Sequence, residues 1–270
     1  MCDHCGCAGS DAGEEAHRSD PVRAGGTTVE SVTVLRGLLA ENDRLAAHNR
    51  EHFDAHGVLA VNLMSSPGAG KTSLLEGTLE RLAGRRQIAV IEGDLATEND
   101  ARRIRAKGVP AVQITTGSAC HLDARMVHEA LDQLALEGLD LLFIENVGNL
   151  VCPASFDLGQ HLDVTLLSVP EGDDKPQKYP VMFRTADLVL LSKTDLLSLL
   201  PEFDPLRAEA SVRALASAVP VLRVSARSGQ GLDEWCAWLD QAFARQRALR
   251  AVAASGRSDE RAVSLAPTAG

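Results

Sequence analysis

The fold of this chain is decided by the stretch Val61-Asn62-Leu63-Met64-Ser65-Ser66-Pro67-Gly68-Ala69-Gly70-Lys71-Thr72-Ser73. An apolar strand, residues 58–64, leads into a tight turn of small residues, and a helix begins at Thr72. A strand, a glycine-rich turn and a helix in this order are the context in which a loop binds the phosphates of a nucleotide. The usual pattern of such a P-loop is G-x-x-x-x-G-K-[ST], and the chain departs from it only at Ser65.

The residue types in this loop suit phosphate binding. Backbone N–H groups of residues 68–71 would surround the β-phosphate, and the positive end of the following helix adds to the attraction. Lys71 would reach the β- and γ-phosphates, and the Thr72 hydroxyl would ligate Mg²⁺. The candidate nucleotide-binding residues of the loop are therefore Gly68, Ala69, Gly70, Lys71, Thr72 and Ser73, and Lys71 is also a candidate catalytic residue.

The composition argues against several classes of protein. Apolar residues make up 45% of the 270 residues, yet no apolar run reaches the length of a membrane span. The first twenty residues are polar and acidic, unlike a secretory signal, so we expect a cytoplasmic protein. The net charge of −10 would repel a phosphate backbone. We therefore expect neither a membrane nor a nucleic acid as a partner.

The alternation of apolar segments predicts an α/β class, with a doubly wound, mostly parallel, seven-stranded sheet of the P-loop NTPase fold. We expect residues 1–26 to be a flexible metal-binding tail, 27–56 an amphipathic helix, 57–250 the P-loop domain and 251–270 a disordered tail. The expected strands are residues 58–64, 87–92, 111–115, 139–144, 164–169, 186–191 and 219–224. Ligands of such sheets bind at the carboxyl ends of the strands.

Residues after the last two strands predict a preference for guanine. Ser192-Lys193-Thr194-Asp195 resembles the N-K-x-D motif of GTPases, with Ser in place of Asn. The Asp195 carboxylate would accept hydrogen bonds from N1–H and the exocyclic amine of guanine, and Lys193 would pack along the base. Ser225 and Ala226 resemble the final GTPase loop, whose backbone N–H contacts the guanine oxygen. The alternatives are a surface helix start capped by Asp195 and a plain strand-to-helix turn at Ser225.

Two acids, Asp94 and Glu145, end the two strands that we expect to flank the P-loop strand. An acid in this place holds Mg²⁺ or orients the attacking water, so both are candidate catalytic residues, and Asp94 is a candidate Mg²⁺ ligand beside Thr72. The alternative is a solvated acid at a strand end. Glu145-Asn146-Val147-Gly148 stands where D-x-x-G would be in a Ras-like protein, and Gly148 could supply an N–H to the γ-phosphate.

Two sets of residues have the chemistry of metal ligands. Cys2, Cys5 and Cys7 form a C-x-x-C-G-C cluster whose thiols can close around one ion, with a fourth ligand from the α-amine, His4 or water. Square-planar S/N ligation suits Ni²⁺, and a tetrahedral arrangement suits Zn²⁺.

The second set follows the third and fourth expected strands, which would bring its loops together if the strands are adjacent. It consists of Cys120, His121 and Cys152, three ligands that a symmetric dimer could complete, although a buried Cys is also a common core residue. We expect Cys236 to be a core residue. The histidines at positions 48, 52 and 56 have helical spacing; they could bind a metal, but we interpret them as a solvated helix face.

Residues 65–72, 145–153, 173–180 and 192–195, together with the C-x-x-C-G-C cluster, resemble the nickel-incorporation GTPases of hydrogenase maturation. The resemblance covers roughly residues 1–250. It implies a GTPase that uses GTP, Mg²⁺, Ni²⁺ and Zn²⁺ and forms a GTP-dependent homodimer. It also implies delivery of nickel to the [NiFe]-hydrogenase large-subunit precursor, with a nickel/zinc-binding maturation partner protein. The family's G-domain metal site falls on Cys120, His121 and Cys152.

Other functions remain open beside this one. They are a urease-type nickel-insertion GTPase, a nickel/zinc buffering protein, and a plain nucleotide kinase or ATPase. The urease-side relative generally lacks the cysteine cluster, which favours hydrogenase. The long His-rich tract of some members is absent, so bulk nickel storage is not expected.

Overall fold

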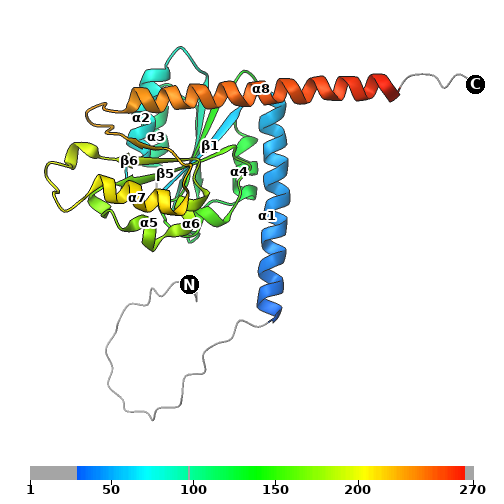
Figure 1. The fold of residues 1–270 in the computed structure, drawn as a ribbon. Helices are drawn as coiled ribbons and strands as arrows, with labels where there is room; N and C mark the ends of the chain where they lie inside the picture. The colour runs from blue at the N-terminus through cyan, green and yellow to red at the C-terminus, as the bar shows by residue number, and fades with distance from the viewer. Residues whose placement is uncertain (1–28, 97, 265–270) are drawn as a thin grey trace, which may run out of the picture. The chain divides into compact units, whose positions relative to one another are not determined.

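The structure, a computed structural model, describes residues 29–96 and 98–264 (Figure 1). Its first helix, α1 (Val29–His56), agrees with the amphipathic helix expected over residues 27–56. The chain divides into two units between Ala40 and Glu41, and the fold below is that of the second unit. The amino-terminal thiols of Cys2, Cys5 and Cys7 lie outside the described residues, so their metal site stays a prediction.

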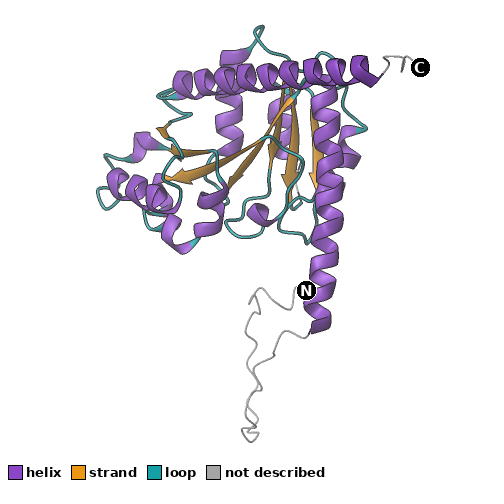
Figure 2. Cartoon of the chain, turned by 45° about the vertical axis from the view of Figure 1, so that its right-hand side comes forward, coloured by secondary structure: helices purple, strands orange, loops and turns teal. Residues whose placement is uncertain are grey.

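Seven parallel strands form one sheet in the order β3-β2-β4-β1-β5-β6-β7. They are β1 (Leu59–Ser65), β2 (Ile88–Asp94), β3 (Ala111–Thr115), β4 (Leu141–Glu145), β5 (Leu162–Ser168), β6 (Leu188–Ser192) and β7 (Val221–Arg223). Every residue of β1, β4 and β6 is buried, because helices cover both faces of the sheet (Figure 2). The predicted seven-stranded α/β fold is confirmed.

The remaining helices are α2 (Lys71–Leu82), α3 (Asn99–Arg105), α4 (Ala124–Leu131), α5 (Lys175–Lys178), α6 (Pro180–Thr185), α7 (Pro205–Leu215) and α8 (Leu232–Ser264). Helices α2, α3 and α8 cover one face, with Leu75, Ile104 and Trp235 in its core. On the other face, α1 and α4 bring Phe53 and Val127 onto the sheet. Helices α6 and α7 cover the β5–β6 end of that second face. Short 3₁₀ turns lie at Pro153–Ser155, Val169–Glu171 and Thr194–Leu196.

Two features of the fold correct the expectations from sequence. Strand β4 lies between β1 and β2, so the strand that ends at Asp94 does not flank the P-loop strand; β4 and β5 do. Helix α8 continues to Ser264, well into the segment 251–270 that was expected to be disordered. That segment is rich in Ala, the residue with the highest helix propensity.

The P-loop strand β1 is the centre of the sheet, and the chain adds β4 on one side of it and β5 on the other. Ligands of open α/β sheets bind where the strand order reverses in this way, at the carboxyl edge. The loops after β1, β2, β3, β4, β6 and β7 carry the candidate site residues. Within the described part of the chain, no helix has the length and apolar character needed to cross a membrane.

Candidate nucleotide and metal sites

The P-loop has the backbone of a phosphate-binding turn. Gly70, the residue before α2, has a φ of 100°, a left-handed conformation that a side chain would strain. Helix α2 then begins at Lys71, whose Nζ donates a hydrogen bond of 3.0 Å to Ser65 Oγ. The departure from the usual glycine at Ser65 therefore gives the Lys71 ammonium group a hydroxyl acceptor at the floor of the loop.

Two cavities open on either side of this loop and share Gly70, Ser73 and Lys193. The first, of about 510 Å³, lies against β6, β7 and α2, and Asp195 and Ala226 line it. The second, of about 420 Å³, lies against the ends of β2 and β4. Its lining includes the predicted residues Gly68, Lys71, Thr72, Asp94, Glu145 and Gly148. From the sequence-based predictions we expect the first cavity to take the base of a nucleotide and the second its phosphates, and we call them the base end and the phosphate end.

At the base end, the segment after β6 is fastened to the P-loop. Ser192 Oγ donates to the Ala69 carbonyl at 2.8 Å, and Lys193 Nζ donates to the Gly68 carbonyl at 2.6 Å. Lys193 adopts a left-handed backbone (φ 59°), which is uncommon for a residue with a side chain. Ser225 is not among the cavity-lining residues; its Oγ donates to Asp195 Oδ1 at 2.7 Å. Ser225 therefore orients the carboxylate that faces the cavity.

At the phosphate end, two carboxyl groups are buried side by side. Thr72 Oγ1 donates to Glu145 Oε1 at 3.0 Å, and Glu92 lies in register with Glu145 on the neighbouring strand. Burial, the charge of Glu145 and a hydrogen bond to it raise the pKa of Glu92 to about 10, and burial also raises the pKa of Glu145. Glu92 is therefore protonated at neutral pH. Within the described residues, Glu92 Oε1 and Glu145 Oε2 have no hydrogen-bond partner.

Two residues at this end, Glu92 and Arg103, were not predicted from the sequence. The sequence does contain a signal for Glu92, because it is a lone acid directly after the apolar run 88–91. It was interpreted only as the last residue of the expected strand 87–92, not as a site residue. Arg103 of α3 also lines the cavity, and its guanidinium donates to Glu76 and Asp100. Asp94, at the end of β2, lines the cavity and accepts a hydrogen bond from the Leu95 N–H at 2.6 Å.

The structure brings Cys120, His121 and Cys152 together. The two sulfur atoms are 3.1 Å apart, and Cys120 Sγ is 3.8 Å from His121 Nδ1. The His121 ring stacks on Phe156 with 4.0 Å between centroids, and burial lowers the pKa of His121, which favours the neutral imidazole that ligates metals. The donor set of two thiols and one imidazole suits Ni²⁺ or Zn²⁺. Cys236, by contrast, is a core residue, as expected.

The loops that carry Cys120 and Cys152 do lie close together, but the predicted cause, adjacency of the strands before them, was wrong. Strands β3 and β4 are not adjacent, because β2 lies between them. The loops after β3 and β4 are instead joined over the end of β2 by side chains of the β4 loop. Asn146 Oδ1 accepts from the Leu122 N–H at 3.1 Å, and Asn149 Nδ2 donates to the Cys120 carbonyl at 3.3 Å.

Residues 145–152, which we call the linking segment, touch both sites. Glu145 holds Thr72 of the P-loop helix, and the Asn149 N–H donates to the Ser65 carbonyl at 2.8 Å. A Cβ on Gly148 would lie 2.7 Å from Pro67 Cα, so the segment packs against the P-loop backbone without room for a side chain. The other end of the segment is Cys152, at the thiol and imidazole cluster.

Taken together, the P-loop, the two cavities beside it and the acids at the carboxyl edge define a P-loop nucleotide-binding domain of the α/β class. Residues 59–223, well over half of the chain, match the family model described as "CobW/HypB/UreG, nucleotide-binding domain". The chain belongs to this family. The predicted resemblance to hydrogenase maturation proteins is confirmed at this level.

The relatives and solved structures agree on one branch of the family. The chain is 57% identical over 221 residues to hydrogenase maturation factor HypB of Azotobacter chroococcum, covering 81% of this chain and 70% of the relative. It is 53% identical over 203 residues to HypB of Escherichia coli, covering 75% and 70%. The crystal structure of HypB from Helicobacter pylori in complex with nickel superposes with a TM-score of 0.73 at 43% identity, covering 76% of this chain and 96% of that one.

We expect Gly148→Ala to weaken nucleotide binding without unfolding the domain. The new Cβ would displace the P-loop backbone at Pro67. The displaced loop would then lose the alignment of its N–H groups. The measurement is the dissociation constant of a fluorescent GTP analogue, together with the thermal midpoint of the free protein. We expect affinity to fall by about 10-fold or more for a misplaced loop. Unchanged affinity would contradict the close packing.

The buried acid pair predicts how stability without nucleotide or metal depends on pH. Because folding raises the pKa of Glu92, the folded protein keeps a proton that the unfolded chain loses above about pH 4.5, and stability decreases as pH rises towards the folded pKa of about 10. Between about pH 6 and 9 we expect a loss of up to about 1.4 kcal/mol per pH unit for one proton.

Glu92→Gln keeps the shape of the side chain but cannot ionise, so the variant should show a clearly smaller decrease over the same range. Urea unfolding at several pH values measures both slopes. Equal slopes for the two proteins would show that Glu92 is ionised in the fold.

Proposed function

We propose that this protein is a GTP-hydrolysing nickel metallochaperone that delivers nickel to the [NiFe]-hydrogenase large-subunit precursor. Its relatives are named hydrogenase maturation factors, and the solved relative from Helicobacter pylori was crystallised in complex with nickel. The observation that carries the proposal is the linking segment, which touches the P-loop at one end and the cluster of Cys120, His121 and Cys152 at the other.

The nucleotide part of the proposal rests on named roles. Lys71 and the P-loop N–H groups bind the phosphates, and Lys193 and Asp195 recognise guanine. Thr72 and Asp94 would hold Mg²⁺, which neutralises charge on the phosphates. The buried Glu145 Oε2, which has no hydrogen-bond partner among the described residues, suits a site that attracts cations. Glu145, held by the Thr72 hydroxyl, orients the attacking water. The products are GDP and phosphate.

The metal part of the proposal treats nickel as cargo. Cys120, His121 and Cys152 bind Ni²⁺ or Zn²⁺ through two thiolates and one imidazole, leaving the coordination sphere incomplete. A GTP-dependent homodimer would bring two such sets together. Two exposed apolar side chains, Leu95 and Val151, lie on the loops that carry Asp94 and Cys152, and they support a protein–protein interface here. The release of nickel involves a nickel/zinc-binding maturation partner in the cytoplasm.

Coupling between the two parts follows from the contacts of the linking segment. GTP fixes the position of the P-loop, and the contacts at Thr72, Pro67 and Ser65 transmit that position to the segment. Asn149 and Asn146 then hold the Cys120 loop. A change in nucleotide would therefore change the geometry of the thiols, and hydrolysis would relax it.

The preference for guanine separates this function from a kinase or ATPase. We expect the wild-type chain to bind GTP far more tightly than ATP, and Asp195→Asn to reduce that preference by about 10²-fold, because its side-chain N–H₂ cannot accept both guanine donors. Ser225 can still donate to the amide oxygen, which keeps the loop in place.

Competition between GTP and ATP for a fluorescent nucleotide measures this preference. Lys71→Ala is the matched comparison, since it should weaken both nucleotides alike through the phosphates. Equal affinity of the wild-type chain for ATP and GTP would defeat the proposal.

A further inference from the structure

Three imidazoles from two helices gather away from both sites described above. His48 and His52 lie one turn apart on α1, and His128 lies on α4. A ring nitrogen from each lies within 4.8 Å of the other two, and the Nε2 atoms of His48 and His52 are 3.1 Å apart. The rings of His48 and His128 have centroids 5.2 Å apart. The cluster therefore combines residues about 80 positions apart in the sequence.

The third histidine of the sequence stripe does not belong to this cluster. His56 Nδ1 is 2.9 Å from the His52 carbonyl oxygen, so one of its ring nitrogens is already hydrogen-bonded to the backbone. The third partner of His48 and His52 is His128, which the helical spacing of α1 could not reveal. The stripe was interpreted as a solvated helix face, whereas the structure half-buries His52 and His128 between two helices.

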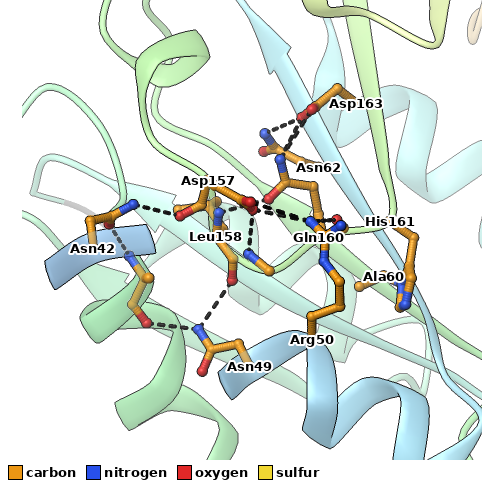
Figure 3. A network of polar contacts seen from close by, with 12 residues as sticks. Asn42, Asn49, Arg50, Ala60, Asn62, Asp157, Leu158, Gln160, His161 and Asp163 are labelled. Atoms are coloured by element: carbon orange, nitrogen blue, oxygen red, sulfur yellow. Dashed lines mark hydrogen bonds and ion pairs between the residues drawn. The ribbon is translucent and has the colours of Figure 1, made fainter. Parts of the chain in front are cut away.

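A buried amide fixes which nitrogen of His128 is free. Asn49 is fully buried, and its Nδ2 donates to the carbonyls of Ala124 at 2.8 Å and Leu158 at 3.1 Å (Figure 3). With both amide protons used, Asn49 Oδ1 can only accept, so His128 Nδ1, 3.1 Å away, must carry the proton. The lone pair of the neutral His128 ring is then on Nε2. A hydrogen bond on the far ring nitrogen is the usual support of a metal-ligating histidine.

The distances also suit ligands of one ion. Two nitrogen ligands of a tetrahedral zinc ion, with bonds of about 2.0–2.1 Å, lie about 3.3–3.4 Å apart. The observed 3.1 Å between His48 Nε2 and His52 Nε2 is close to that value. A carboxylate of Glu51 lies 3.9 Å from His48 Nδ1, on the far side of that ring.

We propose that His48, His52 and His128 form a further site for a divalent transition metal of the zinc and nickel class. Three neutral imidazoles are a ligand set that such ions prefer, with water completing the coordination. The ion would join α1 to α4, whose N-cap Asp123 follows His121 by two residues. The site uses no residue of the nucleotide or thiol sites and does not rest on the function proposed above.

The test uses Zn²⁺ and the full-length chain with serine at positions 2, 5, 7, 120 and 152, so that no thiolate site competes. We expect one zinc ion per chain and an X-ray absorption spectrum with nitrogen and oxygen neighbours and imidazole scattering. His52→Gln and His128→Gln should each weaken zinc binding at least about 10-fold, the smallest loss typical even for residues that only support a ligand. His56→Gln, on the same helix, should change it less than about twofold, since its ring lies outside the cluster.

Thermal midpoints measured without metal verify that each variant folds. If His128→Gln does not fold, His48→Gln replaces it, because the His48 side chain is exposed, and the same loss of zinc affinity is expected. Failure of the serine variant to bind zinc, or equal affinity of all histidine variants, would overturn the proposal. The three rings would then be a hydrogen-bonded cluster only. Loss of nucleotide binding in separate Lys71 variants bears only on the function proposed above.

Discussion

The structure depends on the packing of the linking segment, residues 145–152, against the P-loop. No side chain fits between Gly148 and Pro67, and on either side of this contact Glu145 holds Thr72 and Asn149 holds the Ser65 carbonyl. Three contacts of different kinds, steric, charge-assisted and backbone, therefore fix one loop against the other. A loop held in this way cannot shift alone, and the thiol of Cys152 belongs to the same eight residues.

The chemistry of the phosphate end follows from where the sheet buries its acids. Strands β2 and β4 are adjacent and in register, so Glu92 and Glu145 meet in a buried environment. Two carboxyl groups in such a place cannot both be ionised without cost, which is why one keeps its proton. The domain accepts this unfavourable pair at the edge where phosphates and their counter-ion are expected to bind. The buried acid pair therefore lowers the stability of the fold at the edge where binding of phosphates and their counter-ion requires a charged side chain.

Much of the fold could be predicted because its signals are local. The apolar run before Ser65, the turn glycines and the strand ends before Asp94, Glu145 and Asp195 are all readable in a few neighbouring residues. Strand order is not local, so the position of β4 between β1 and β2 was missed, and with it the pairing of Glu92 with Glu145. The partnership of His128 with His48 and His52, and the hydrogen bonds of Asn146 and Asn149, depend on tertiary packing in the same way.

The most direct test of this account is the nickel affinity of the Cys120, His121 and Cys152 site in the full-length chain with serine at positions 2, 5 and 7. It is measured through thiolate absorbance without nucleotide, with GDP, and with a non-hydrolysable GTP analogue. The analogue should change the affinity by about 5- to 150-fold relative to the other two states, the usual range for coupled sites. Identical affinities in all three states would show that the linking segment does not join the two sites, and would contradict the account.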